Sequence, residues 1–240
     1  MRPIEGAAMT GCYRLVIGNR NYSSWSLRAW LFLRESGIPF EEIRIPMFTA
    51  TWTDEIAKYS PAGRVPVLLH GSIAVWDSTA ISHYIGERHP QAIGWPKSAD
   101  ARAYAQSISG EMHSGFHALR DELPQNIRAR RRRDLALLSH SCLAQIRRIE
   151  QIWSDCRARF GARGDWLFGE FSLADVMFAP VALRFLTYDI PLREPAREFQ
   201  RAVCQLASVR QWVAAASEET ETIEFIDDLM PASRSPLTLG

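Results

Sequence analysis

Along the first half of the chain, the spacing of apolar residues switches several times between the pattern of a strand and the pattern of a helix. Tyr13–Ile17 is apolar and rich in β-branched residues, which predicts a strand. Apolar positions then recur at helical spacing from about Trp25 until Gly37 and Pro39, which predicts a helix. Beyond them the pattern predicts a strand over 40–45, a helical stretch over 52–59, a hairpin of strands over 65–69 and 73–75, and a helix that begins at 77–78.

This order of elements, β-α-β-α-β-β-α, is typical of a thioredoxin-like domain, in which helices cover a mixed sheet. We assign residues 13–89 to this domain and residues 1–12 to a flexible extension. Two prolines and a glycine in residues 90–97 interrupt any helix there, so we interpret this segment as a linker.

Beyond residue 98 the pattern is helical almost throughout. It predicts long helices over 98–128 and 134–160, a helix over 172–186 and shorter helices to about residue 227. Pro124 is expected to kink or end the first of them. The predicted fold class is therefore α/β plus all-α, with an all-helical second domain over 98–230 and a flexible tail over 231–240.

Composition narrows the range of functions. The net charge of +1 gives no overall attraction to nucleic acid or to anionic lipid. Four scattered cysteines lack the spacing of a zinc site, so we expect free thiols in a reducing cytoplasm and no metal. No apolar run reaches the ~18 residues of a spanning helix, so no membrane partner is expected.

The first segment with candidate chemistry contains Ser23 and Ser24, at the junction of the first strand and first helix. A helix N-terminus presents unpaired N–H groups and roughly half a positive charge, which favour an anion. A serine hydroxyl there can donate a hydrogen bond to a thiolate and lower the pKa of that thiol. The alternative is that both serines are only helix caps.

Two further segments have a similar ambiguity. Pro66 directly precedes a β-branched strand, and a cis Val65–Pro66 bond would turn the Val65 backbone outward to pair with an extended peptide. Cis bonds before proline are uncommon, so the residues alone favour trans. Asp77 and Ser78 begin a helix, where they either hold the charged end of a ligand or act only as caps.

Together these three segments resemble the glutathione-binding domain of cytosolic glutathione transferases. Ser23–Arg28 resembles the S-S-C-S-x-R signature of the zeta class, the maleylacetoacetate isomerases. Ser60–Leu68 resembles the N-P-x-G-x-V-P-x-L segment of the family, and Asp77–Ile81 resembles its [E/D/Q]-S-x-A-I segment. The resemblance extends over nearly the whole chain.

The resemblance implies that Ser23 is the thiol-activating residue, with Ser24 as a close alternative and Tyr22 as a third candidate. It implies that Pro66 is cis. The residues that it implies for binding glutathione are Val65, Pro66, Asp77 and Ser78. Trp25 stands where the zeta signature has a cysteine, which excludes thiol chemistry at that position and puts zeta-type isomerisation in doubt.

The second domain offers a candidate wall for the electrophile pocket. Met112, His113 and Phe116 lie early in it, where the family places that wall, although core packing is an equal alternative. Arg184 is a charge on an apolar helix and needs a partner: a substrate carboxylate, as proposed for the zeta class, or an internal salt bridge, which we favour.

Two other motifs of the second domain are interpreted as structural. Ser172 and Asp175 form a capping-box-like start to an apolar helix, which resembles the S-x-A-D motif in the core of the family's helical domain. Arg128–Arg133 is interpreted as a solvated corner rather than a nucleic-acid site, because no basic surplus or interleaved aromatic residues accompany it.

We therefore expect a glutathione transferase that conjugates the thiol of glutathione to a small electrophile. A glutathione-dependent cis–trans isomerase of the maleylacetoacetate type and a non-catalytic binding protein of the same fold are the alternatives. The resemblance implies glutathione as co-substrate and a homodimer.

Overall fold

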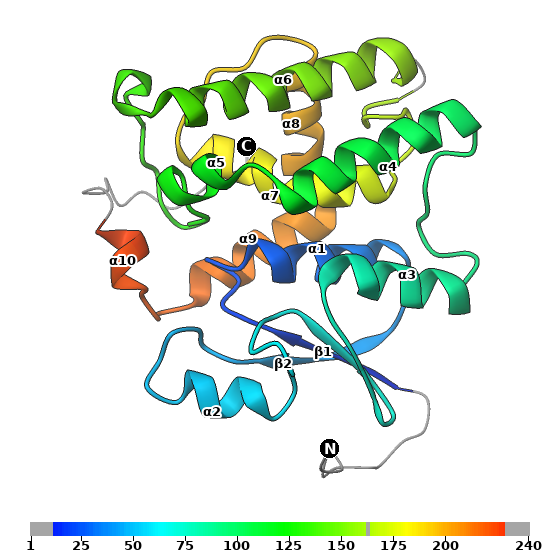
Figure 1. Cartoon of the computed structure of the whole chain (residues 1–240), viewed down its shortest axis with the longest axis vertical. Helices are drawn as coiled ribbons and strands as arrows, with labels where there is room; N and C mark the ends of the chain where they lie inside the picture. Colours follow the sequence, from blue (N-terminus) through cyan, green and yellow to red (C-terminus); the bar gives the residue numbers. More distant parts are fainter. Residues whose placement is uncertain (1–11, 162–163, 229–240) are drawn as a thin grey trace.

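The computed structural model describes residues 12–161 and 164–228. Its first half follows the predicted order of elements (Figure 1). These elements are β1 (Tyr13–Ile17), α1 (Ser24–Glu35), β2 (Phe40–Arg44), α2 (Trp52–Ala57), β3 (Val67–His70), β4 (Ile73–Val75) and α3 (Ser78–Arg88). The predicted flexible extension, apart from Cys12, and the predicted tail lie outside the described residues.

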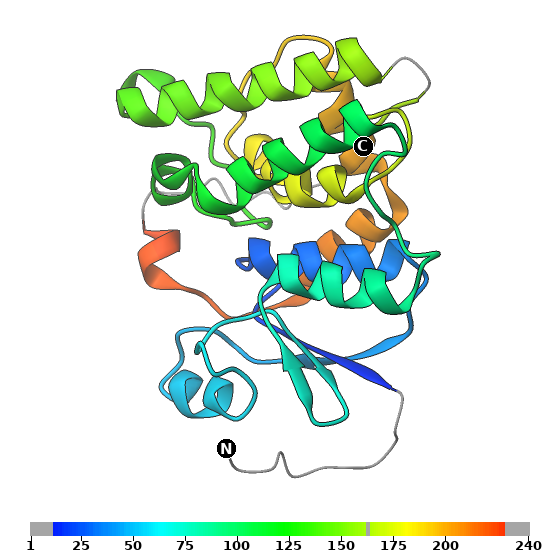
Figure 2. The same cartoon turned by 45° about the vertical axis from the view of Figure 1, so that its right-hand side comes forward.

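The strands form one mixed sheet in the order β2-β1-β3-β4. β1 pairs in parallel with β2 and antiparallel with β3, and β3 pairs antiparallel with β4. Side chains alternate along β1, so Leu15 joins the large core that includes α1 and α3, whereas Val16 packs near Ile56 of α2. The sheet therefore lies between α1 and α3 on one face and α2 on the other (Figures 1 and 2).

The described part of the second half is built from helices and their connecting loops (Figure 2). They are α4 (Ala99–Ser114), α5 (His117–Glu122), the 3-10 helix η1 (Leu135–Leu137), α6 (His140–Phe160), α7 (Leu173–Thr187), α8 (Ala196–Gln205), α9 (Ala207–Glu218) and α10 (Glu224–Asp227). Among the described residues, no helix combines the length and apolar character needed to cross a membrane.

Several predicted boundaries differ from the structure. The helix predicted over 134–160 begins only at His140, after the 3-10 helix η1. The long helix predicted over 98–128 is interrupted at Gly115, which is extended, and at Phe116, which has a left-handed φ of 62°. The second piece, α5, ends at Glu122 before it reaches Pro124, because the residue before a proline disfavours the helical conformation. In the first half, the strand predicted from residue 65 begins only at Val67, after the proline that cannot donate to a ladder.

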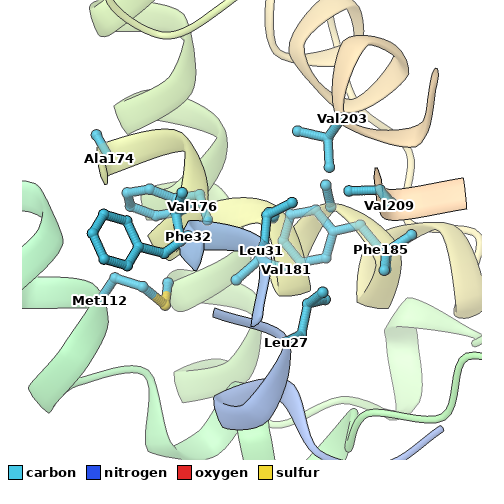
Figure 3. Close-up of a cluster of buried hydrophobic side chains, with 14 of the residues drawn as sticks. Leu27, Leu31, Phe32, Met112, Ala174, Val176, Val181, Phe185, Val203 and Val209 are labelled. Carbon is cyan, nitrogen blue, oxygen red and sulfur yellow. The ribbon is translucent and has the colours of Figure 1, made fainter. Parts of the chain in front are cut away.

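One hydrophobic core joins the two halves of the molecule. In α7, fourteen of fifteen residues are buried, and α1 packs directly against it. Figure 3 shows Leu27, Leu31 and Phe32 of α1 beside Val181 and Phe185 of α7. Burying one such side chain stabilises the fold by about 1.5–3 kcal/mol, so α1 is held from the helical side as well as from the sheet. The proposed domain limits at residues 89 and 98 stay a prediction.

The start of α7 is fixed by the predicted capping box. The buried carboxylate of Asp175 accepts hydrogen bonds from the backbone N–H groups of Leu167 (2.9 Å) and Ser172 (2.8 Å), and from the Ser172 hydroxyl (2.8 Å). Burial raises the pKa of Asp175 to about 6, while these hydrogen bonds act in the opposite direction. Asp175 thus ties α7 to the preceding loop.

The arginine-rich segment Arg128–Arg133 is only in part the solvated corner that the sequence predicts, since Arg132 is exposed whereas its neighbours make contacts within the protein. Arg131 is only 4% exposed and donates to the backbone oxygens of Ile226 (2.7 Å) and Asp227 (2.9 Å). Arg128 donates to the loop before α10. A helix as short as α10 leaves most of its carbonyl groups unpaired, and the Arg131 guanidinium supplies donors for two of them.

Replacing Asp175 with Asn turns an amide N–H₂ group toward the backbone N–H of either Leu167 or Ser172. That backbone N–H group then loses its acceptor. We expect the free energy of unfolding, measured by urea denaturation, to fall by about 2–3 kcal/mol. The control Ser98→Ala removes an exposed helix cap, for which about 1 kcal/mol or less is expected. Equal losses in the two variants would contradict the role assigned to Asp175.

Candidate functional site

The β1–α1 loop (residues 18–23) places both candidate serines at the N-terminus of α1. Ser23 is the helix N-cap and Ser24 is the first helical residue, and they are 5% and 6% exposed. The Ser23 hydroxyl accepts a hydrogen bond from Ser26 N (3.2 Å) and donates to Ser26 Oγ (2.8 Å). Ser26 Oγ also accepts from Gly18 N (3.1 Å), so a chain of hydrogen bonds supports Ser23 from behind.

The first turn of α1 leaves backbone donors unused. Within the described residues, the N–H groups of Ser24 and Trp25 have no hydrogen-bond acceptor, and neither has the Ser24 hydroxyl a partner. Free N–H groups at a helix N-terminus attract an anion. The structure therefore shows that Ser23 is a cap, as the alternative interpretation holds, and that it stands beside a site suited to negative charge.

The Tyr22 hydroxyl is engaged in hydrogen bonds with the helical half of the molecule. Its hydroxyl donates to Asp227 Oδ2 (2.6 Å) and accepts from the Arg128 guanidinium (3.1 Å). Burial, followed by the hydrogen bond to Asp227, raises the pKa of Tyr22. A phenol that is bonded to a carboxylate is a poor donor to a thiolate, so Tyr22 is the weakest of the three candidates.

The Val65–Pro66 peptide bond is cis, the isomer that the resemblance implies. Both residues precede β3, the strand that pairs with β1. Val65 contacts the smaller core under α2 and is partly exposed. Because the start of β3 pairs with the end of β1, the Val65 backbone lies at the same end of the strands as the β1–α1 loop.

Asp77 caps α3 and connects it to the helical domain. Its Oδ1 accepts from Thr79 N (3.0 Å), and its Oδ2 lies 3.1 Å from His113 Nε2 of α4. His113 Nδ1 lies 3.0 Å from the Thr79 hydroxyl, and the His113 ring contacts the edge of Trp25 at a centroid distance of 5.2 Å. His113 thus links the starts of α1 and α3.

Ser78 carries an unsatisfied polar group. It is 1% exposed, and its hydroxyl has no hydrogen-bond partner among the described residues. Leaving a buried hydroxyl unpaired costs about 1–3 kcal/mol, which a ligand that supplies the missing partner recovers. This is the position that the resemblance implies for the γ-glutamyl end of glutathione.

A cavity of about 300 Å³ lies between α3, α4 and the beginning of α7. Its wall combines apolar side chains with polar groups, including the hydroxyl of Ser109, which is buried and unpaired. Side chains in the wall include Thr79, His83, Trp95, Ser109, His113 and Met177. Of the three residues predicted to line an electrophile pocket, His113 lies in this wall.

Met112 and Phe116 lie elsewhere than expected. Met112 is 1% exposed and packs in the large core, near Phe32 (Figure 3). Phe116 is 6% exposed in the same core and serves as the residue before α5. The i and i+4 spacing does not place them on one helix face, because α4 ends at Ser114 and Phe116 lies after the break. Core packing, the other interpretation, describes both residues.

Arg184 does not form the internal salt bridge that we favour from sequence. It is 3% exposed and donates to Leu119 O (3.4 Å), while Asp189 faces Arg132 instead. Burial lowers the pKa of Arg184 to about 10, and repulsion from Arg120 acts in the same direction. Arg184 therefore remains a cation at neutral pH.

Sequence reasoning missed two more arginines at this place. Arg28 is 1% exposed, and both terminal nitrogens of its guanidinium group are buried without a hydrogen-bond partner in the described structure. The guanidinium groups of Arg28 and Arg120 lie 4.4 and 4.8 Å from the Trp25 ring. Burial lowers the pKa of Arg28, and the charges of Arg120 and Arg184 lower it further. The fixed arginine of the S-S-x-S-x-R signature was the available signal.

The remaining ionisable groups give little evidence of a further centre. Cys142, Cys156 and Cys204 are buried free thiols whose pKa values burial raises to about 11, 12 and 12. Over residues 12–161 and 164–228, no cluster of three or more His, Cys, Asp or Glu side chains has the arrangement of a metal site.

Two protein-family models match the chain. The model of the glutathione S-transferase N-terminal domain matches residues 22–88, and that of the C-terminal domain matches residues 110–215. The two matches together cover well over half of the chain. The protein therefore belongs to the glutathione S-transferase family, which confirms the family and the fold class predicted from the sequence.

Individual relatives agree with this assignment. Glutathione S-transferase 1 of Dianthus caryophyllus is 29% identical over 168 residues, which are 68% of this chain and 73% of the relative. A probable maleylacetoacetate isomerase of Caenorhabditis elegans is 28% identical over 100 residues, or 42% and 46% of the two chains. The crystal structure of a glutathione transferase homologue from Burkholderia, with bound glutathione, has a TM-score of 0.64 at 21% identity and covers 86% of this chain and 99% of its own.

The two candidate serines are expected to differ in their effect on stability. Ser23→Ala removes the cap of α1 and should lower the free energy of unfolding by about 1 kcal/mol. Ser24→Ala breaks no hydrogen bond of the described residues and should change it by less than about 0.5 kcal/mol. Urea denaturation of both variants, without ligand, measures the difference. Equal losses would contradict the cap assignment.

Proposed function

We propose that the protein is a glutathione transferase in which Ser23 stabilises the thiolate of bound glutathione. The observation that carries this proposal is the combination at the start of α1 of a hydroxyl and two free backbone N–H groups. A thiolate placed there gains one hydroxyl hydrogen bond and the positive end of the helix dipole.

The Ser23–Ser26 pair supports this role. A hydroxyl hydrogen rotates to suit its surroundings, so Ser26 can become the donor of the 2.8 Å hydrogen bond. Ser23 Oγ would then accept from both the hydroxyl and the N–H of Ser26, and its own hydrogen would point to the sulfur. Two donors to its oxygen strengthen Ser23 as a donor.

The rest of glutathione is proposed to bind at residues already described. The backbone of Val65 pairs with the cysteinyl part. The Ser78 hydroxyl gains its missing partner from the γ-glutamyl carboxylate, and the Asp77 carboxylate attracts the ammonium group. His113 holds Asp77 in place.

The reaction needs little more than a placed and ionised sulfur. The thiol proton passes to solvent, the sulfur forms a bond to the electrophilic carbon, and the leaving group departs with the electron pair of its own bond. A thiolate held beside the electrophile loses less entropy in the transition state. The cavity beside His113 is the proposed place of the electrophile.

Ser23→Ala tests the thiolate proposal directly. We expect the pKa of bound glutathione, followed by the ultraviolet absorbance of the thiolate during a pH titration, to rise by about one to two units. The conjugation rate with an activated chloronitrobenzene should fall at neutral pH and recover at higher pH. The control Ser139→Ala removes the cap of α6 and should leave the thiol pKa unchanged.

Two results of the titration would contradict the proposal. A larger shift in Ser24→Ala than in Ser23→Ala would exchange the roles of the two serines. A wild-type protein that neither binds nor ionises glutathione would favour the non-catalytic alternative.

A second candidate function is the isomerisation of a carboxylate-bearing substrate. The guanidinium groups of Arg28 and Arg120 lie beside Trp25, and the buried cation Arg184 is close enough to repel both. Among the described residues, none of the three forms a salt bridge with a carboxylate. Such a group of cations favours a dianionic ligand. In this reaction the sulfur adds to a carbon of the double bond, the resulting single bond rotates, and elimination returns glutathione.

Arg184→Met separates the two candidates. If a carboxylate binds there, the inhibition constant for maleate should rise at least about tenfold, since a hydrogen bond to a charged group is worth about 1.5–3 kcal/mol. Conjugation of a neutral electrophile should change little. Arg34→Met, which removes an exposed guanidinium group from the Trp30 ring, is the matched control. No inhibition by maleate in the wild type would exclude this second function.

We further propose a homodimer in the cytoplasm. Its support is membership of a family in which these properties are typical. Size-exclusion chromatography with light scattering distinguishes a dimer from a monomer or a trimer.

A further inference from the structure

The β1–α1 loop receives most of its hydrogen bonds from the helical half of the molecule. Glu219, directly after α9, accepts from the backbone N–H groups of Arg20 (2.9 Å, Oε1) and Asn21 (3.1 Å, Oε2). Glu219 is 8% exposed. One carboxylate therefore fixes two consecutive peptide groups that lie three and two residues before Ser23.

Asn21 is anchored through every polar group that it has. Besides the bond to Glu219, its backbone oxygen accepts from Ile127 N (3.1 Å), its Oδ1 accepts from Arg128 N (2.7 Å), and its Nδ2 donates to Asn126 Oδ1 (3.0 Å). Asn21 is fully buried. All four partners belong to the helical half, more than 100 residues away in sequence.

The loop's own domain contributes less. Asn19 accepts from Met47 N (2.7 Å), and the N–H groups of Tyr22 and Ser23 bond to Asn19 O (3.2 and 2.8 Å). These contacts shape the turn but do not fix it against the electrophile side. The direction of the Ser23 hydroxyl thus depends on how the helical half holds Arg20 and Asn21.

The charge of Glu219 requires a separate argument. A carboxylate close to the start of α1 disfavours a thiolate there, so its presence is not explained by charge. Arg20 and Arg44 lie 3.8 and 3.6 Å from Glu219 Oε1 and compensate for it. The presence of Glu219 is instead explained by geometry, because the two oxygens of a carboxylate can accept from both N–H groups at once.

We infer that Glu219, acting through Asn21, is a positioning residue that holds the serine loop in the geometry required to activate the thiol. This role rests on the proposed function. It assigns a task to the end of α9, which the sequence analysis left without one.

Glu219→Gln tests this role because the loss of loop support and the loss of negative charge shift the pKa of bound glutathione in opposite directions. The amide keeps one acceptor and turns a donor toward the other N–H group, so the loop loses part of its support. A positioning role predicts that the pKa of bound glutathione rises and that the conjugation rate at neutral pH falls about fivefold to tenfold. Removal of a nearby negative charge alone predicts that this pKa falls.

Two controls accompany the variant. Glu221→Gln removes the same charge from the same segment and breaks an ion pair to the same Arg44 (2.7 Å), but its side chain contacts neither loop N–H group. It should leave the thiol pKa unchanged. Asn126→Ala removes the acceptor of the Asn21 amide without a change of charge and should raise the thiol pKa as Glu219→Gln does, which keeps the test valid if Glu219→Gln does not fold.

Hydrogen exchange of the ligand-free protein gives a second measurement. Faster exchange confined to residues 19–23 in Glu219→Gln, together with a raised thiol pKa, supports the role. An unchanged or lowered thiol pKa, in a wild type that ionises glutathione, overturns it and leaves the proposed function intact. A wild type that does not ionise glutathione overturns both, and loss of rate with an unmoved pH profile shows a merely structural role.

Discussion

The packing of α1 against α7 is the contact on which the rest of the structure depends. α1 begins at the candidate serines, covers the sheet with one face and gives its other face to the most buried helix of the molecule. Because the two halves share this core, their relative placement is fixed by apolar side chains that interdigitate, such as Leu31 and Phe185. The polar groups between the halves, from Asp77 and His113 to Asn21 and Glu219, can then meet at hydrogen-bond distances.

The same arrangement explains why charged side chains lie in unusual surroundings. Desolvation of the buried guanidinium groups of Arg28 and Arg184 is costly, and the packing of the surrounding core offsets this cost. Among the buried polar atoms without a partner in the described residues are those of Arg28 in α1, Ser78 at the start of α3 and Ser109 in α4. Leaving such an atom unpaired is costly, and Ser109 lines the cavity between α3, α4 and α7, where a polar ligand would supply the partner.

Much of the fold followed from sequence because its signals are local. The apolar, β-branched run of β1, the serine before α1 and the Ser172–Asp175 pair each act within a few residues, and the structure shows them as expected. Local patterns did not predict contacts between residues that are far apart in the sequence. The path of Arg128–Arg133 depends on carbonyl groups of α10, and the burial of Met112 and Phe116 depends on α1 and α7, neither of which periodicity reveals. The site residues Ser23, Asp77 and Ser78 came from a motif, whereas Arg120 and Glu219 carried none.

The buried cysteines of the helical half have a consequence for a protein that is proposed to act on electrophiles. Cys142, Cys156 and Cys204 lie within the core with their thiols held in the neutral form. Alkylating agents react with thiolates far faster than with thiols. Under the proposed mechanism, an alkylating agent in the cavity beside His113 would meet one ionised sulfur, that of glutathione, while the three buried protein thiols stay neutral. The helical half is protected in this way from covalent damage by the compounds that the protein would consume.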